Sequence, residues 1–289
     1  GDMSKSRRTH RVSRQRRPLI RSRGHWEFIV LAVLALIASG WVLRSAGLPS
    51  GAVSQPPVAV VHTLGVDVVR EFPHDRSAYT QGLLWWAGRL YESTGRWGES
   101  TLRRLDPQTG TVEQWIDIAP GFFGEGLARV GDRLFMLTWK SERVLAFDLK
   151  TFDSLRPLRY QGEGWGLCHD GARLVMSNGS DVLTFRDPES FESIGDVRVT
   201  LRGRPLGNLN ELECVDGSVY ANVWEHDYIV RIDLANGRVT HQIDASNLLT
   251  RAEARGVDVL NGIAYSPETD TFYITGKWWP KMFEVSFVD

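Results

Sequence analysis

The sequence predicts an all-β protein, a five-bladed β-propeller preceded by an N-terminal transmembrane or signal helix. One observation is a short motif that recurs five times, at intervals of about 40 to 50 residues. A second is that a turn and a hydrophobic strand follow each copy, and that further short strands come next, as in a propeller blade. The five copies begin with Gln81-Gly82-Leu83, Glu125-Gly126-Leu127, Trp165-Gly166-Leu167, Asn210-Glu211-Leu212 and Asn261-Gly262-Ile263.

The N-terminal segment is unlike the repeats. Residues 1–25 are rich in Lys and Arg, and their first two residues, Gly1-Asp2, look like a cloning scar. Residues 26–44 form a mostly apolar run. A basic head before an apolar run is typical of a secretory signal or of a membrane anchor whose basic side lies in the cytoplasm. Because no small-x-small cleavage site follows closely, we expect an uncleaved anchor. A buried core helix and a basic nucleic-acid-binding arm are the other interpretations.

The charge distribution supports the same division. The first 44 residues hold ten of the 34 Lys and Arg but only two of the 35 Asp and Glu, so the rest of the chain is acidic. An acidic body argues against a nucleic-acid surface, and the basic excess lies where the positive-inside rule places it. We therefore expect a monomeric, periplasmic body that the N-terminal segment anchors to the inner membrane. Residues 45–64 would be a linker, and residues 65–289 one propeller domain.

The strands within each repeat are separated by turn residues. The first turns are Ala87-Gly88, Gly131-Asp132, Asp170-Gly171, Asp216-Gly217 and residues 267–271. A hydrophobic second strand follows each of them, and a third strand comes next, as at residues 144–148 and 229–233. A turn such as residues 106–110 then leads to the fourth strand.

The first residue of each repeat is polar or aromatic. A position that only packed in the core would be expected to hold an aliphatic residue instead. The innermost strand of a propeller blade runs along the central channel, so its first residue should lie near one mouth of the channel. Antiparallel pairing returns the end of the second strand to that mouth. The first strands open with Gln81, Glu125, Trp165, Asn210 and Asn261, and the second strands end at Gly95, Trp139, Gly179, Trp224 and Lys277. One pocket should collect a carboxylate, amides, three tryptophans and a lysine.

Glu125 is the candidate acid/base in this pocket. A lone carboxyl group among apolar rings should have a raised pKa, which suits proton exchange near neutral pH. The alternative is that Glu125 only accepts structural hydrogen bonds, that the tryptophans fill space between blades, and that Asn210 and Asn261 are turn residues. Trp85, Trp86 and Trp115 lie outside the repeat register, and we expect them to be packing or surface residues.

The cysteines and histidines give weaker signals. Cys168 and Cys214 lie just inside the first strands of adjacent repeats, where we expect two buried thiols; a disulfide is the alternative in an oxidising compartment. No zinc-type spacing occurs among the scattered histidines, which we expect at the surface or in loops. These are His62, His74, His169, His226 and His241.

Five motifs, taken together and in order, carry a resemblance to a known family. They are Tyr79-Thr80-Gln81-Gly82-Leu83, Gly124-Glu125-Gly126-Leu127, Glu163-Gly164-Trp165-Gly166-Leu167, Asn210-Glu211-Leu212-Glu213 and residues 275–281. This set resembles the plant and bacterial type of glutaminyl-peptide cyclotransferase over about residues 68–285. The resemblance implies a five-bladed propeller that converts the N-terminal glutamine of peptides and proteins to pyroglutamate and releases ammonia.

The resemblance also implies roles for particular residues. Glu125 falls on the catalytic glutamate of the family. The substrate-binding positions fall on Gln81, Tyr79, Trp139, Trp165, Asn210, Trp224 and Lys277. Asn261 is a further candidate at the channel mouth, and the motif leaves open whether Lys277 or Lys281 faces the pocket. Tyr79 is a departure, because the family usually has Phe there.

The implied chemistry needs no cofactor and no catalytic metal, although a structural divalent cation in the central channel remains open. Two other functions stay open on the residues alone. One is a metal-dependent, lactonase-like hydrolase in which Glu125, Asn210 and Asn261 would hold a cation through oxygen. The other is a non-catalytic propeller whose tryptophans stack on a ligand.

Overall fold

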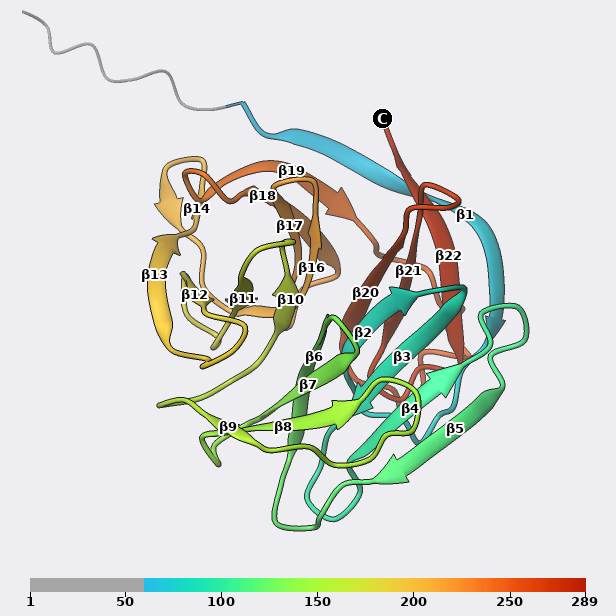
Figure 1. Cartoon of the computed structure of the whole chain (residues 1–289). Helices are drawn as coiled ribbons and strands as arrows, with labels where there is room; N and C mark the ends of the chain where they lie inside the picture. Colours follow the sequence, from blue (N-terminus) through green and yellow to red (C-terminus); the bar gives the residue numbers. More distant parts are fainter. Residues whose placement is uncertain (1–59) are drawn as a thin grey trace, which may run out of the picture. The chain divides into compact units, whose positions relative to one another are not determined.

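The computed structural model of the protein describes residues 60–289, which form 22 β-strands (Figure 1). The predicted N-terminal helix and most of the predicted linker lie outside the described residues. Within residues 60–289, no helix is long and apolar enough to cross a membrane. The prediction of an all-β fold is confirmed for this part of the chain.

Five four-stranded antiparallel units, here called blades 1 to 5, contain most of the strands. Blade 1 consists of β2 (Thr80–Trp86), β3 (Arg89–Thr94), β4 (Thr101–Leu105) and β5 (Val112–Asp117). Blade 2 consists of β6 (Gly124–Val130), β7 (Arg133–Thr138), β8 (Arg143–Asp148) and β9 (Leu158–Arg159). Blade 3 consists of β10 (Leu167–His169), β11 (Leu174–Met176), β12 (Val182–Arg186) and β13 (Ser193–Arg198).

The last two blades are joined in one larger sheet. Blade 4 consists of β16 (Leu209–Val215), β17 (Ser218–Val223), β18 (Tyr228–Asp233) and β19 (Arg238–Asp244). Blade 5 consists of β20 (Leu260–Ser266), β21 (Thr271–Gly276), β22 (Lys281–Val288) and β1 (His62–Pro73). A short hairpin, β14 (Thr200–Leu201) with β15 (Arg204–Pro205), lies between blades 3 and 4 in the sequence and pairs with β19.

The first strands of the five blades form a closed ring. In this ring β2 contacts β6, β6 contacts β10, β10 contacts β16, β16 contacts β20, and β20 returns to β2. Figure 1 shows the blades arranged around these strands. The arrangement is that of a five-bladed propeller, and it brings the starts of the first strands to one end of the channel.

Strand β1 closes the ring by joining the two ends of the described chain. It pairs antiparallel with β22, from Gly65 opposite Val288 to Pro73 opposite Lys281, so the N-terminal strand is the outer strand of the C-terminal blade. Its first residues also pair parallel with β19, which links blades 4 and 5. Because β1 begins at His62, it includes the last three residues of the predicted linker, 62–64.

The glycine after an opening residue allows neighbouring first strands to approach closely. A Cβ atom on Gly126 would lie 2.5 Å from the backbone nitrogen of Leu167, and one on Gly166 would lie 1.9 Å from the backbone oxygen of Asn210. A side chain at either position would therefore push two blades apart. This contact explains why the repeated motif has glycine beside the opening residue in these blades.

Glu211 connects three blades from inside the ring. Its carboxylate oxygens accept the backbone N–H groups of Leu83 in blade 1 and Ile263 in blade 5, at 3.1 and 2.8 Å. Its side chain is fully buried, and this burial raises its pKa well above the usual range. Because both oxygens are taken by backbone donors, Glu211 has a structural role, and the repeat register alone did not single it out.

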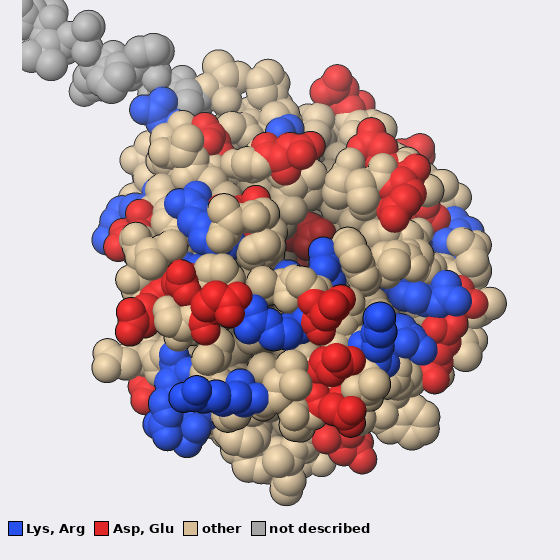
Figure 2. Space-filling model, in the orientation of Figure 1, with Lys and Arg blue, Asp and Glu red and all other residues tan. Residues whose placement is uncertain are grey.

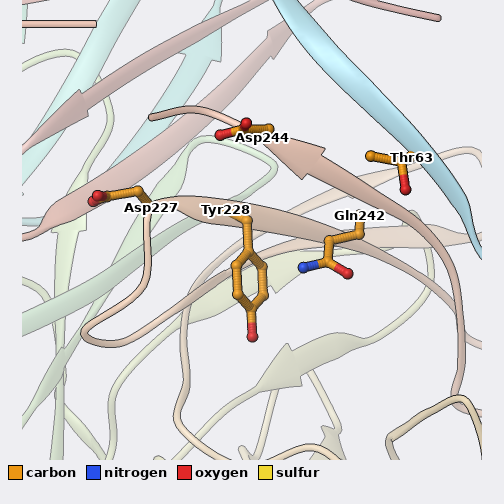
Figure 3. A pocket seen from close by; sticks show the side chains of 5 residues that line it. All are labelled: Thr63, Asp227, Tyr228, Gln242 and Asp244. Carbon is orange, nitrogen blue, oxygen red and sulfur yellow. The ribbon is translucent and has the colours of Figure 1, made fainter. Parts of the chain in front are cut away.

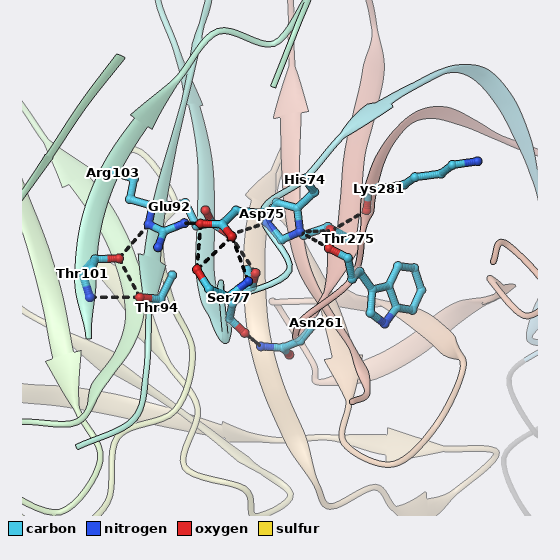
Figure 4. Close-up of polar contacts among 12 residues, drawn as sticks. His74, Asp75, Ser77, Glu92, Thr94, Thr101, Arg103, Asn261, Thr275 and Lys281 are labelled. Carbon is cyan, nitrogen blue, oxygen red and sulfur yellow. Dashed lines mark hydrogen bonds and ion pairs between the residues drawn. The ribbon is translucent and has the colours of Figure 1, made fainter. Parts of the chain in front are cut away.

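His74 lies in the loop that follows β1, one of the two places expected for the histidines, but it is not at the surface. His74 is buried, and its ring nitrogens contact a Glu92 carboxylate oxygen and the Trp279 carbonyl oxygen, each at 2.8 Å (Figure 4). Burial alone would lower the pKa of His74, but the Glu92 carboxylate and the Trp279 carbonyl outweigh it, so the pKa is raised. The pair joins the end of β1 to β3, across the junction of blades 5 and 1.

The expectation of two free thiols is wrong, since Cys168 and Cys214 form a disulfide with a Cα–Cα distance of 5.5 Å. The bond joins β10 of blade 3 to β16 of blade 4. The two residues occupy similar places in adjacent first strands, and ring closure brings those strands together. The structure thus selects the disulfide that the sequence left as an alternative.

Candidate active site

The residues that open the repeats lie at irregularities in the strand pairing, or just before the first strand. In blades 1, 2, 4 and 5, the register between the first and second strands shifts at or just after the opening residue. Such a bulge adds a residue to one strand and re-aims its side chain. In blade 3, Trp165 instead precedes β10, and its backbone still pairs with Ser177. The shifts begin beside Gln81, Glu125, Asn210 and Asn261.

Three of these residues form a chain of hydrogen bonds across three blades. The Asn261 amide nitrogen lies 3.4 Å from Oε1 of Gln81, and the Gln81 amide nitrogen donates to Oε1 of Glu125 at 3.2 Å. Asn261 also donates to the Thr80 carbonyl, so the orientation of both amides is fixed. The Oδ1 atoms of Asn210 and Asn261 are buried and have no hydrogen-bond partner among the described residues. Unpaired polar atoms of this kind are suited to a bound ligand.

Glu125 has the electrostatic environment predicted for an acid/base. Its side chain is 4% exposed, and burial raises its pKa well above the usual range for a carboxyl group. The nearby Lys277 ammonium opposes this effect, and the Glu163 carboxylate adds to it. A glutamate with a raised pKa can both accept and return a proton near neutral pH.

Lys277, and not Lys281, lies beside the other site residues. It directly follows β21, its side chain is buried, and its Nζ atom is 4.6 Å from the centre of the Tyr79 ring. Burial lowers the pKa of Lys277, against the attraction of Glu125 and Asp258. Lys281 instead forms ion pairs with Glu71 and Glu253, at 2.7 and 2.8 Å.

The three predicted tryptophans form one half-buried wall, and Glu163 holds two of them. Its Oε2 atom accepts the indole N–H groups of both Trp139 and Trp165, at 3.0 and 3.1 Å. Trp165 meets Trp224 edge to face, with ring centres 5.8 Å apart. Gly179 leaves room for this wall, because a Cβ atom there would lie 2.7 Å from the Trp165 ring.

Sequence reasoning missed several residues that complete the mouth. Phe123 packs against Tyr79 and Trp139, and the Tyr79 hydroxyl donates to Asp258 at 3.2 Å. Glu163 and Phe123 have a signal in the sequence. Both lie two residues before an opening residue, as Tyr79 does, so this second register position could have identified them.

A cavity of about 310 Å³ adjoins these rings and is lined by Tyr79, Arg96, Trp97, Phe123 and Trp139. A cavity of about 360 Å³ lies elsewhere, on the outer strands of blade 4 and β1 (Figure 3). Its lining residues are Thr63, Asp227, Tyr228, Gln242 and Asp244, and none of them belongs to the predicted site. The chemistry gathered at the channel mouth therefore identifies the candidate site better than cavity size.

The face of the molecule seen in Figure 2 has no single sign of charge. Lys and Arg side chains lie among Asp and Glu side chains there, and a hollow near the centre contains an acidic group. A nucleic-acid surface usually has a continuous basic patch. That the protein binds no nucleic acid stays a prediction.

Comparison with known proteins shows the family to which the chain belongs. Residues 42–287 match the family described as Glutamine cyclotransferase. The sequence is 40% identical over 226 residues to the glutaminyl-peptide cyclotransferase of Arabidopsis thaliana, covering 76% of this chain and 70% of that relative. The structure is similar to that of Myxococcus xanthus glutaminyl cyclase, with a TM-score of 0.74, 41% identity, and coverage of 79% of this chain and 99% of the other. The chain therefore belongs to the glutamine cyclotransferase family.

Proposed function

We propose that Glu125 is the general acid/base with which this glutaminyl-peptide cyclotransferase converts an N-terminal glutamine to pyroglutamate. The observation that carries the proposal is the buried carboxyl group of Glu125, which has a raised pKa, accepts a hydrogen bond from Gln81 and lies close to Lys277 at the channel mouth. Family membership supports the reaction. The arrangement of these residues supports the role of Glu125.

The reaction is an intramolecular exchange of one C–N bond for another. The α-amine nitrogen of the substrate attacks the carbon of its own γ-amide, and the ring closes. Glu125 takes a proton from the attacking amine and returns one to the departing amide nitrogen, which leaves as ammonia. Because nucleophile and electrophile belong to one residue, the pocket mainly has to hold the glutamine side chain folded back, and positioning of this kind accelerates reactions strongly.

The walls and polar groups of the pocket suit this task. The flat faces of Trp139, Trp165 and Trp224 can confine the folded side chain. Donors are needed where the carbonyl oxygen gains negative charge, and we assign this role to the Asn210 amide and the Lys277 ammonium. A partly dry site also favours the neutral α-amine, which is the reactive form.

The experiment that tests the function is a coupled assay of ammonia release from a Gln-initiated dipeptide, with mass analysis of the pyroglutamyl product. We expect turnover with N-terminal Gln and none with N-terminal Asn, because the shorter side chain would have to close a strained four-membered ring. Absence of ammonia from all Gln peptides would contradict the proposal.

We further propose that catalysis needs no metal, because the proton transfers need only Glu125, and an amide and an ammonium group lie beside it. Among residues 60–289, no group of three or more His, Cys, Asp or Glu is placed to hold a metal ion. Exhaustive chelation should leave turnover intact, even if it lowers thermal stability by removing a structural cation. Activity that is lost and then restored by zinc or calcium would favour the metal-dependent alternative.

We also propose that the protein works outside the cytoplasm, anchored through its N-terminal segment. The Cys168–Cys214 disulfide supports an oxidising compartment. Fractionation of cells that express the full chain should find the protein in the membrane fraction, accessible to protease from the periplasmic side. Recovery in the cytosol with reduced cysteines would contradict this.

A further inference from the structure

The cavity at the channel mouth extends beyond the residues that the glutamine needs. Tyr79, Phe123 and Trp139 line this cavity, and Tyr79 and Trp139 are also proposed to bind the glutamine, whereas Arg96 and Trp97 come from the loop between β3 and β4. A glutamine held at Glu125 must direct the rest of its peptide out through the mouth. The shared walls therefore place the next residue of the substrate at this cavity.

Trp97 is unusual among the cavity residues because it is half exposed. Its side chain is 50% exposed, and its ring meets Phe123 edge to face, with ring centres 5.7 Å apart. A large exposed aromatic ring at the rim of a pocket is typical of a recognition surface, because it offers much contact area with little flexibility. With Tyr79, Phe123 and Trp139, it gives the cavity four aromatic walls.

The loop that presents Trp97 is held firmly. Arg96 has a left-handed backbone, with φ of 87°, which is an unfavourable conformation for a residue other than glycine. Its guanidinium lies 5.1 Å from the ring centre of Trp278 and 5.9 Å from that of Tyr79. The Ser100 hydroxyl donates to the Arg96 carbonyl and accepts the Gly124 N–H, next to Glu125. The strained loop is thus fastened to the start of β6.

We propose that this cavity binds the side chain of the residue that follows the N-terminal glutamine, and that Trp97 makes the enzyme prefer aromatic or large apolar side chains there. The inference rests on the proposed function and adds a substrate class to it. The four rings favour an apolar or aromatic occupant. The Arg96 guanidinium disfavours Lys or Arg in the same place by repulsion, although its Nε atom is already paired with Glu99 at 3.2 Å.

The test compares kcat/KM for Gln-Phe-amide, Gln-Gly-amide and Gln-Lys-amide, since amidation removes a C-terminal carboxylate that Arg96 could bind. For the parent enzyme we expect kcat/KM to be about tenfold higher for the Phe peptide than for the Gly peptide, mainly through KM, because burying and stacking one ring has about this effect. The Lys peptide should be the poorest of the three. Trp97→Ala should bring the Phe-to-Gly ratio close to one, and Trp97→Phe should keep most of it.

Trp115→Ala is the matched control, because Trp115 is 61% exposed on the outer strand β5 of the same blade and does not line the cavity. It should keep both the activity and the ratio of the parent. A parent ratio near one, or a parent-like ratio in folded Trp97→Ala, would overturn the inference while leaving the cyclotransferase function intact. A parent enzyme that releases no ammonia from any Gln peptide would overturn the proposed function, and this inference with it.

Discussion

The proposed chemistry depends on one carboxyl group, that of Glu125. Glu125→Gln keeps the shape of the side chain and its acceptor for the Gln81 amide, but removes the group that exchanges a proton. We expect kcat to fall by about 10²–10⁴-fold, with a much smaller change in KM, because the aromatic walls remain. Initial rates of ammonia release measure both constants. Glu189→Gln, at an exposed turn, is the control, and near-parent turnover in a folded Glu125→Gln would refute the role.

The pH dependence of kcat tests the surroundings of the same carboxyl group. Glu125 must be ionised to accept the amine proton, so kcat should fall as pH decreases through its raised pKa. Lys277→Met removes a positive charge that favours the carboxylate and so raises the pKa of Glu125. The fall of kcat at low pH, here called the acid limb, should therefore move to higher pH. Glu163→Gln removes a negative charge that disfavours it, so the limb should move to lower pH. Shifts in the same direction would show that another group controls the limb.

Among the strands and loops, the buried pair of His74 and Glu92 fastens blade 5 to blade 1. Removing one partner of a buried ion pair leaves an uncompensated charge, which typically lowers the free energy of unfolding by about 3–5 kcal/mol. Glu92→Gln should therefore lower the urea midpoint strongly. His226→Gln, at an exposed histidine, should leave it near the parent value, and a parent-like midpoint for Glu92→Gln would show that the pair does not stabilise the junction.

The same pair predicts a pH window for stability. The pKa of His74 is raised, so its contribution is complete below the unfolded value of 6.5 and is lost as pH rises through the higher folded value. The pKa of Glu92 is lowered, so its contribution is present above 4.5 and is lost as pH falls through the lower folded value. The difference in urea midpoint between the parent and Glu92→Gln should therefore be largest between pH 4.5 and pH 6.5.

Across the whole ring, the Cys168–Cys214 bond connects two neighbouring blades over 46 residues of sequence. A cross-link of this length typically contributes about 2–4 kcal/mol to the free energy of unfolding. The double variant Cys168→Ser, Cys214→Ser should be less stable by this amount and keep its turnover, since neither cysteine lines the site. Reducing agent should destabilise the parent in the same way and leave the double variant unaffected. Loss of activity in the folded double variant would show that the bond also positions the site.

The sequence by itself determined the repeat, the number of blades and the residues that begin the first strands at the mouth. It could do so because a blade repeats one hydrogen-bonded pattern along the chain, so that equivalent positions fall on one end of the ring. Gln81, Glu125 and Asn261 could therefore be placed near one another without coordinates. The same local pattern located Trp139, Trp224 and Lys277 directly after their second strands.

Only the tertiary structure decided which side chains contact one another between blades. Glu163 joins Trp139 to Trp165, His74 meets Glu92, and Cys168 meets Cys214 because ring closure brings together segments that the repeat leaves apart. The repeat register gives Glu163 and the two cysteines recurring positions, but it cannot show which side chains meet across two blades, since each partner alone also fits a loop, a turn or a core. Lys277 differs from Lys281 for the same reason: the bend after β21 directs the first toward Tyr79, and the start of β22 directs the second toward Glu71 and Glu253.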